Sequence, residues 1–350
     1  MVKDKHYASW VEKLPSLEGK TVAITGTTSG TGYWTAVAAL RKGAKLVLLL
    51  NRKSTRAENS EKKLQEEIES VKSSTQLKSV ECDLMRFESV RNAAKEIASI
   101  TAEHGGLDVL ANNAGIMGFP DNRTADGYEV QMQTNHLSHF LLTSLLLKPL
   151  QDAAESRGEA RVVQHSSGAR NMFGSALEEK YFEKSEPKTL GGDSLQQNFL
   201  RYHQTKLANS CFALGMHKRL EKAGIINVKS IVSEPGIAAT DLASNLGAAN
   251  KGIGKKIIGA VLGLYVRLFV KVQSPADGAL PLIEGCFGAN VDGGDFFYPE
   301  QRQTGIPYKA ISKGEPVKPN SEKLSMDETS QDLLWKKSEE AIGSAFLSDI

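Results

Sequence analysis

Short apolar runs alternate with longer amphipathic or polar runs along most of the chain. The apolar runs predict strands at 21–25, 45–50, 77–82, 108–112, 161–166, 227–232 and 294–298. The runs between them predict helices over 31–42, 57–72, 89–104, 126–147 and 200–223. Strands that are apolar throughout and alternate with helices are typical of a parallel sheet covered on both faces. We therefore predict an α/β fold with a doubly wound parallel β-sheet of about seven strands, in three α/β/α layers.

Two long segments, residues 169–199 and 238–276, interrupt this alternation. Irregular segments of this length within a compact domain are usually functional loops. We predict a single domain over residues 20–312 that carries both insertions. The remaining parts are an N-terminal extension, 1–19, and a C-terminal tail, 313–350, with a short amphipathic helix near 331–342.

The composition narrows the class of protein. The chain has 350 residues, is 40% hydrophobic, which allows a sizeable core, and carries a formal net charge of +2. A nearly neutral chain without a block of Lys and Arg gives no support for nucleic-acid binding. The first 20 residues are charged and contain no apolar signal segment, so we expect an intracellular, most simply cytoplasmic, protein.

The cysteines and histidines do not suggest a metal site. Three cysteines lie far apart without zinc-type spacing, which favours a reducing compartment. Three histidines lie in predicted helices, and we expect them to be packing or surface residues rather than metal ligands. These residues are Cys82, Cys211, Cys286, His136, His139 and His203.

One apolar segment, residues 257–272, needs a separate explanation. It contains Arg267 and Lys271 and is shorter than the roughly 20 residues that cross a bilayer, so we do not predict a transmembrane helix. A lid or packing helix is the simpler interpretation. Contact with a membrane surface stays open as the alternative, because several lysines precede the segment.

Tyr202 and Lys206 stand four residues apart in a predicted helix, so their side chains share one face. A lysine ammonium beside a tyrosine hydroxyl favours the phenolate and lowers a pKa that is otherwise about 10. Such a tyrosine can donate or accept a proton near neutral pH. Of the eight tyrosines, only Tyr202 has a lysine four positions on. Alone the pair is weak evidence, because about one such pair is expected by chance in a chain of this length.

A glycine-rich turn connects the first predicted strand to the first predicted helix. Glycines let backbone N–H groups approach a pyrophosphate closely, and the N-terminus of the following helix favours its negative charge. The placement of the turn therefore predicts a dinucleotide site, with a tight turn that holds no ligand as the alternative. Its candidate cofactor-binding residues are Gly26, Thr28, Ser29, Gly30, Thr31 and Gly32.

The glycine spacing, three residues and then one, together with Tyr202 and Lys206, resembles the short-chain dehydrogenase/reductase family in its ordinary form. The match covers roughly residues 20–299, most of the chain, with the motifs in family order. The resemblance implies a Rossmann-type fold and a nicotinamide dinucleotide cofactor.

Further motifs carry the same resemblance. Asn135 matches the asparagine of the family's catalytic tetrad, whose backbone carbonyl holds a water that links the lysine to solvent. Ser167 matches the catalytic serine, with Ser166 as the competing assignment. Simpler explanations remain for both, a helix-surface amide and a strand-end turn. The cofactor-binding residues implied elsewhere are Asp83, Leu84, Asn112, Ala114, Gly115, Tyr202, Lys206, Pro235, Gly236 and Thr240.

The resemblance implies catalysis by hydride transfer between a nicotinamide and a substrate carbon. Tyr202 would protonate a carbonyl oxygen in reduction or deprotonate an alcohol in oxidation. Ser167 would hydrogen-bond the same oxygen, and Lys206 would lower the pKa of Tyr202 and hold the ribose hydroxyls.

The end of the second predicted strand bears on the choice of cofactor. NAD enzymes usually place an acidic residue there, but this strand ends Leu50-Asn51-Arg52-Lys53. Arg52 and Lys53 could pair with a 2′-phosphate, so we favour NADP(H) over NAD(H). The alternative is that Arg52 is only a solvated loop residue.

The spacing from Ser167 to Tyr202 resembles the branch that contains retinol dehydrogenases, WW-domain oxidoreductases and light-dependent protochlorophyllide reductases. Ser138 stands where this branch usually has glycine, and Ala208 where the light-driven reductases carry a cysteine, which argues against photochemistry. The apolar character of the second insertion favours a small apolar carbonyl or alcohol substrate. Two other hypotheses remain, a noncatalytic NADP-binding sensor or scaffold and a peripheral-membrane reductase of lipids or retinoids. A homo-oligomer is possible.

Overall fold

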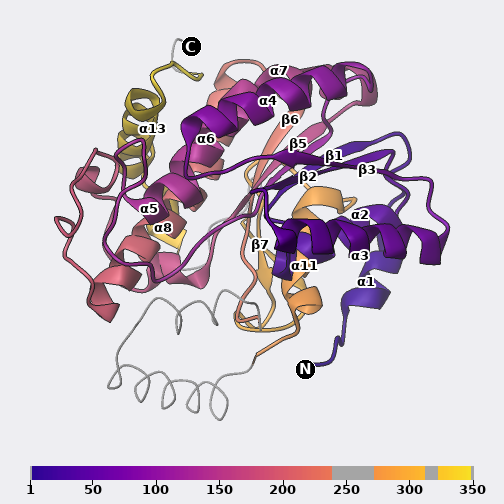
Figure 1. Cartoon of the computed structure of the whole chain (residues 1–350), viewed down its shortest axis with the longest axis horizontal. Coiled ribbons are helices and arrows are strands. Elements are labelled where there is room, and N and C mark those ends of the chain that lie inside the picture. Colours follow the sequence, from indigo (N-terminus) through magenta and orange to yellow (C-terminus); the bar gives the residue numbers. More distant parts are fainter. Residues whose placement is uncertain (1, 239–271, 312–321, 348–350) are drawn as a thin grey trace.

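A central β-sheet organises the computed structural model, which describes residues 2–238, 272–311 and 322–347. Within these residues the sheet has eight strands in the order β3-β2-β1-β4-β5-β6-β7-β8 (Figure 1). The first seven strands pair in parallel, and β8 runs antiparallel to β7. The strands are β1 Thr21–Thr25, β2 Leu46–Asn51, β3 Gln76–Glu81, β4 Val109–Asn112, β5 Ala160–His165, β6 Val228–Ser233, β7 Phe296–Pro299 and β8 Pro307–Ile311.

The predicted Rossmann-type fold is confirmed, and each predicted strand lies within two residues of an observed one. The apolar runs place strands this well because both faces of the central strands are buried, as in β1, β2 and β4. The additional strand, β8, lies at the sheet edge and is only partly buried, so no continuous apolar run marks it.

Helices cover both faces of the sheet and build two cores (Figure 1). Alternate side chains along each strand point to opposite faces of the sheet. Ala23 and Leu48 pack in the first core, whereas Ile24 and Leu49 pack in the second. The first core contains α4 Phe87–Ala102, α6 Ser138–Leu145, α7 Leu147–Arg157, α8 Leu195–Lys222 and α13 Glu328–Ile342. The second contains α1 Tyr7–Lys13, α2 Gly30–Arg41, α3 Thr55–Val71 and α11 Pro275–Phe287.

The single long helix predicted over 126–147 is wrong, because the structure divides this region. A short helix, α5 Val130–Met132, leads into a π-helical turn, η1 Gln133–Leu137, before α6 begins. In the turn the Ser138 N–H bonds to the carbonyl of Gln133, five residues back. Such π-helical turns are rare in proteins overall, and those that occur often lie at functional sites. This one contains Asn135.

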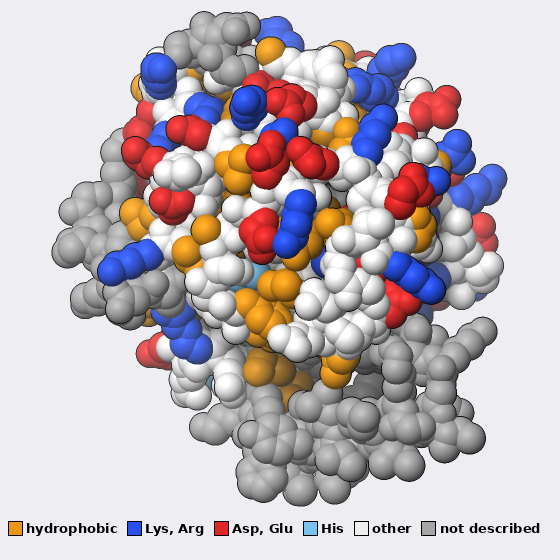
Figure 2. Space-filling model, turned by 90° about the vertical axis from the view of Figure 1, so that its left-hand side faces the viewer, with side chains coloured by type: hydrophobic (Ala, Val, Ile, Leu, Met, Phe, Trp, Pro, Cys, Tyr) orange, Lys and Arg blue, Asp and Glu red, His pale blue; other side chains and the backbone are white. Residues whose placement is uncertain are grey.

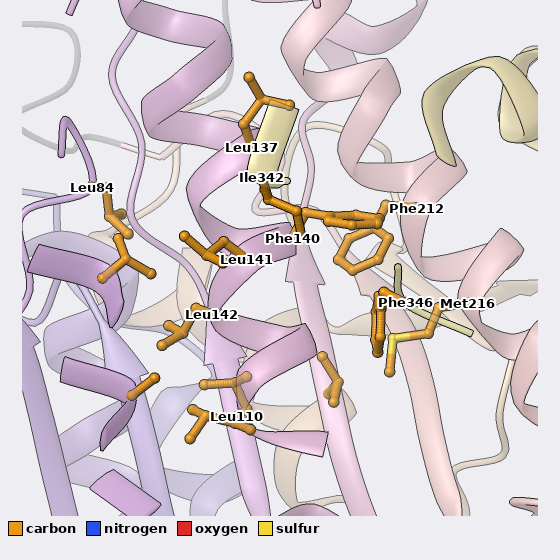
Figure 3. Packing of buried hydrophobic residues seen from close by; sticks show 14 of the residues in the cluster. Leu84, Leu110, Leu137, Phe140, Leu141, Leu142, Phe212, Met216, Ile342 and Phe346 are labelled. Carbon is orange, nitrogen blue, oxygen red and sulfur yellow. The ribbon is translucent and has the colours of Figure 1, made fainter. Parts of the chain in front are cut away.

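The C-terminal helix α13 belongs to the body of the molecule. It packs along α8 (Figure 1), and Trp335 on α13 is buried against Phe140 and Phe212. The Phe346 ring, beyond α13, lies 5.4 Å from that of Phe140 (Figure 3). The predicted tail helix near 331–342 is thus present and docked. By contrast, Thr240, residues 257–271 of the apolar segment and most of the second insertion lie outside the described residues.

Candidate active site

The predicted site residues gather at the carboxyl edge of the sheet. The glycine-rich turn follows β1, Asn112 ends β4, Ser167 follows β5 and Pro235 follows β6. The strand order reverses between β1 and β4, and ligands of doubly wound sheets bind beside such a reversal.

The glycine-rich turn is closed by Asn113, which stands between the predicted cofactor-binding residues Asn112 and Ala114 but is not itself one of them. Its Nδ2 donates to the carbonyl of Thr25 (2.9 Å), and its Oδ1 accepts from Thr31 Oγ1 (2.7 Å). A Cβ on Gly32 would lie 2.3 Å from the Gly26 carbonyl oxygen and 2.4 Å from Asn113 Nδ2. Only glycine fits there, so the turn is shaped by its own backbone and by this asparagine.

The first turn of α2 offers a site for an anion. Ser29 holds the N-cap position, but its Oγ accepts a hydrogen bond from Arg56 Nη2 (2.6 Å) instead of from the helix. N–H groups at a helix start carry a partial positive charge that favours phosphate. The turn therefore fits the pyrophosphate of a dinucleotide, and Arg56 adds a guanidinium beside it.

The end of β2 carries a polar but uncharged residue at the position that is acidic in NAD enzymes. Asn51 Oδ1 accepts from the Thr27 N–H (2.9 Å) and Asn51 Nδ2 donates to Thr27 Oγ1 (2.7 Å). Asn51 thus ties the glycine-rich turn to β2. The next residue, Arg52, is exposed, and Arg56 follows one turn later on α3. Two guanidiniums are thereby available at this edge.

Two of the predicted cofactor-binding residues turn their side chains into the protein. Asn112 is fully buried and donates to Thr143 Oγ1 (2.8 Å), and the Leu84 side chain is part of the first core. The Leu84 carbonyl accepts from Ser138 Oγ (2.6 Å), so the serine that replaces the branch's glycine ties the β3–α4 connection to α6. Asp83 is half-buried, and its Oδ1 accepts from the Met85 N–H (3.0 Å).

Ala114 and Gly115 lie between the two halves of the site. The Ala114 N–H donates to Thr25 Oγ1 (2.9 Å), which fixes this segment on β1. A Cβ on Gly115 would lie 3.2 Å from Asn135 Oδ1 and 3.4 Å from Lys206 Nζ. Gly115 therefore brings the cofactor side of the site next to two of the predicted catalytic residues.

The structure settles the geometry of the serine pair. Ser166 is buried, and its hydroxyl donates to the Lys206 carbonyl (2.7 Å), so it fastens β5 to α8. Ser167 is only half-buried, and its side chain hydrogen-bonds Tyr202. Of the two serines, Ser167 is the one whose side chain interacts with Tyr202, and its catalytic role stays a prediction.

Tyr202 and Lys206 are both buried on α8. Burial raises the pKa of Tyr202 to about 12, and the hydrogen bond from Ser167 offsets only part of this effect. The Lys206 ammonium lies 5.8 Å from the centre of the tyrosine ring and donates to the His165 carbonyl (2.9 Å). The prediction that Lys206 lowers the pKa of Tyr202 is therefore wrong for this structure, because burial raises that pKa and the lysine charge does not offset it.

Burial also shapes the surroundings of Lys206, whose own pKa it lowers to about 8. His139 has its pKa lowered to about 4 and His165 to about 3, mainly by burial and also by the Lys206 charge. Both imidazoles are therefore neutral at neutral pH. Lys206 is the cationic group of this pocket below its pKa.

Asn135 is fully buried, so it is not a helix-surface amide. Its Oδ1 accepts from the Ile116 N–H (2.8 Å), and its Nδ2 donates to Thr205 Oγ1 (3.0 Å) on α8. The Asn135 carbonyl pairs with His139 Nδ1 at 2.9 Å. A carbonyl oxygen can accept two hydrogen bonds.

The predicted cofactor-binding residues Pro235 and Gly236 form a turn after β6. Gly236 has a φ of +64°, and a Cβ there would lie 2.4 Å from the Gln303 carbonyl oxygen. The next N–H, of Ile237, donates to that oxygen (2.8 Å). The Pro235-Gly236 turn is thus fastened to the β7–β8 connection.

The first insertion packs onto α8 instead of extending away from it. Arg201, adjacent to Tyr202, is fully buried, and its Nη1 donates to the carbonyls of Leu190 and Gly192, each at 3.0 Å. His203 Nδ1 lies 3.0 Å from the Ala169 carbonyl oxygen. The histidine is therefore a packing residue, as predicted, and the insertion is held over the serine side of the site.

This arrangement is a Rossmann-type fold with a glycine-rich turn between its first strand and first helix, the class of fold that binds dinucleotides. A family model described as short chain dehydrogenase matches residues 20–179. Mouse retinol dehydrogenase 11 is 31% identical over 75% of this chain and 72% of its own length. The chain belongs to the short-chain dehydrogenase/reductase family, in its retinol dehydrogenase-like branch.

Two further comparisons extend this result. An uncharacterized oxidoreductase of Schizosaccharomyces pombe is 38% identical over 65% of this chain, and the match spans 63% of that protein. A crystal structure of an uncharacterized protein from Mycobacterium paratuberculosis has a TM-score of 0.68, with 26% identity and 99% of both chains covered. Among residues 2–238, 272–311 and 322–347, no helix combines the length and apolar character needed to cross a membrane.

Proposed function

We propose that this protein is an NADP(H)-dependent oxidoreductase that interconverts a carbonyl and an alcohol on a small apolar substrate. The observation that carries the proposal is the convergence of Tyr202, Ser167 and Lys206 beside the glycine-rich turn. Tyr202 contacts Ser167, and Lys206 approaches Gly115 from the same helix. No single one of these residues would indicate the reaction, whereas the set supplies a proton donor, a hydrogen-bond donor and a cation.

Tyr202 is the proposed general acid and base. Its raised pKa keeps the hydroxyl protonated at neutral pH, which suits the donation of a proton to a carbonyl oxygen. Ser167 would hydrogen-bond the same oxygen and stabilise the charge that develops on it. Lys206, cationic below its pKa of about 8 and close to Gly115, would hold the ribose hydroxyls of the dinucleotide.

Asn135 and His139 complete the proposed machinery. The Asn135 carbonyl lies in the π-turn and is bonded by His139, while the Asn135 amide is bonded to Ile116 and α8. A water bound to this carbonyl would link Lys206 to solvent. The fixed orientation of the carbonyl supports this role.

The residues of the glycine-rich turn fit a nicotinamide dinucleotide, which supplies or accepts the hydride when bound. The turn and the start of α2 would hold the pyrophosphate, because the N-terminus of the helix favours negative charge. Arg52 and Arg56 would pair with a 2′-phosphate. Because Asn51 stands where an acidic residue would select NAD(H), we favour NADP(H).

Exposed apolar side chains around the site support an apolar substrate. Met172 follows the serine loop, Leu195 begins α8 and Ile237 follows Gly236, and they are 55%, 42% and 37% exposed. Figure 2 shows hydrophobic side chains gathered among charged ones on one face of the molecule. A retinoid-like, steroid-like or lipid aldehyde or ketone fits these surroundings.

The test is turnover by purified protein against a panel of apolar aldehydes and ketones, with NADPH and NADH in parallel. We expect oxidation of NADPH, and loss of about 100- to 10,000-fold in activity in Tyr202→Phe. Tight NADPH binding without turnover of any substrate would favour the sensor or scaffold alternative. Failure to bind either dinucleotide would contradict both.

A further inference from the structure

A buried arginine lies directly behind the catalytic serine proposed above. Arg170 is fully buried, and its Nη1 donates to the Ser167 carbonyl (3.0 Å). The remaining donors of the guanidinium bind two carboxylates. Nη1 contacts Glu234, while Nη2 and Nε donate to the two oxygens of Glu322 at 2.7 and 3.1 Å. The ring of Phe296 covers the guanidinium at 4.6 Å.

The chemistry of this cluster demands that every partner be present. Arg170 and Glu322 are each completely removed from solvent, and a buried charge is tolerated only when it is paired and hydrogen-bonded. A guanidinium that bonds a carboxylate through two parallel N–H groups has a fixed plane as well as a fixed position. The Ser167 backbone is therefore oriented by the carboxylates on the far side of Arg170.

The two carboxylates come from distant parts of the chain. Glu234 directly precedes the Pro235-Gly236 turn, so Arg170 connects the serine loop to the turn after β6. Glu322 belongs to the C-terminal segment, 152 positions from Arg170. It also pairs with Arg302 Nη1 at 3.3 Å, in the β7–β8 connection.

The same C-terminal segment contacts the other two elements that carry proposed catalytic residues. Ser325 Oγ hydrogen-bonds Ser210 Oγ (2.8 Å) on α8, the helix of Tyr202 and Lys206. Ser338 Oγ lies 2.9 Å from Nε2 of His136, which follows Asn135 in the π-turn. The tail thus contacts the serine loop, α8 and the π-turn through three separate polar contacts.

We propose that residues 322–347 form a brace for the active site, in which Glu322 is a positioning residue that acts on Ser167 through Arg170. This inference rests on the proposed function, because it assigns Glu322 an effect on catalysis through the serine. The brace sets the position of the Ser167 hydroxyl toward Tyr202. It leaves the glycine-rich turn untouched.

The test is a double-mutant cycle with Glu322→Gln and Ser167→Ala, in which kcat, the Kd for NADPH and the thermal unfolding midpoint are measured. We expect Glu322→Gln to lower kcat about 10- to 100-fold with the Kd for NADPH within about twofold of wild type. In the Ser167→Ala background the same substitution should lower kcat no further, because coupled residues are not additive. Glu328→Gln is the matched control, since Glu328 lies in the same segment but pairs with Lys218 on the surface (2.9 Å).

The outcomes separate the brace from the proposed function. A lower unfolding midpoint with unchanged kcat would show a purely structural role and overturn the brace, as would losses that multiply in the double mutant. Full activity of Ser167→Ala would instead overturn the proposed function, and the brace with it. If Glu322→Gln does not fold, Glu322→Asp, which keeps the charge and withdraws the carboxylate, carries the same cycle.

Discussion

The phosphate side and the serine side of the site are built by different means. Around the glycine-rich turn, the buried contacts come from neutral groups: Asn113 and Asn51 bond the backbone and the hydroxyls of Thr31 and Thr27. The charged group that contacts this turn, Arg56, is exposed. Behind Ser167, by contrast, the contacts are between buried charges, with Arg170 bound to two carboxylates.

This difference determines which kind of substitution disrupts each side of the site. The phosphate side depends on the absence of side chains, so it is broken by adding atoms. The serine side depends on complete pairing of charges, so it is broken by removing a partner, which leaves another charge buried alone. We therefore expect substitutions on the phosphate side to affect cofactor affinity, and those on the serine side to affect turnover.

The largest effect on the phosphate side should come from Gly32→Ala. The added methyl would meet the Gly26 backbone and Asn113 at less than 2.5 Å, so the turn must move. Overpacking of this kind costs about 1–3 kcal/mol. If that cost falls on the binding-competent turn, NADPH binds about 10- to 100-fold more weakly, which fluorescence titration would measure.

Gly215→Ala is the control for this substitution. Gly215 lies inside α8, and a Cβ there makes only ordinary contacts of 3.4 Å or more. We expect wild-type NADPH affinity for this variant. Unchanged affinity in Gly32→Ala as well would show that the turn does not approach the cofactor.

The choice between NADP(H) and NADH should depend on Arg52 and Arg56. A hydrogen bond to a charged group contributes about 1.5–3 kcal/mol, so removal of either guanidinium should cut the NADPH preference about tenfold or more. The ratio of kcat/KM for NADPH and NADH measures this. Arg41→Ala, at the opposite end of α2 and paired with Glu67, should leave the ratio unchanged.

On the serine side, the pH profile should report the charge of Lys206. Its pKa is lowered to about 8, so the ammonium is present below this pH and lost above it. Carbonyl reduction requires this cation and a protonated Tyr202, whose pKa of about 12 is higher. We therefore expect kcat/KM for reduction to be flat near neutral pH and to fall about tenfold per pH unit above about 8. A flat profile to pH 10 would contradict this role of Lys206.

The same division explains what the sequence could predict. The glycine-rich turn and the Tyr202–Lys206 pair are local patterns, since their members lie within a few positions of one another. The strands could be predicted equally well, because central strands that are buried on both faces appear in the sequence as apolar runs. Arg56 lies one helical turn after Arg52, so the same reasoning could have found it.

The residues that position Ser167 form no such local pattern in the sequence. Arg170 and Glu322 are charged residues in polar stretches, and nothing near either of them indicates burial. Their pairing depends on the tail returning across α8, and the π-turn at Asn135 likewise depends on tertiary packing. The pKa of Tyr202 could not be predicted either, because spacing along a helix gives the neighbour but not the desolvation.

The most direct test of the division between the two sides is NADPH titration and turnover of Ser167→Ala. The account predicts a kcat lowered by about 100-fold or more, as for the loss of one donor to a developing oxyanion, with a Kd for NADPH within about twofold of wild type. Parallel losses of affinity and turnover, or full activity, would contradict it.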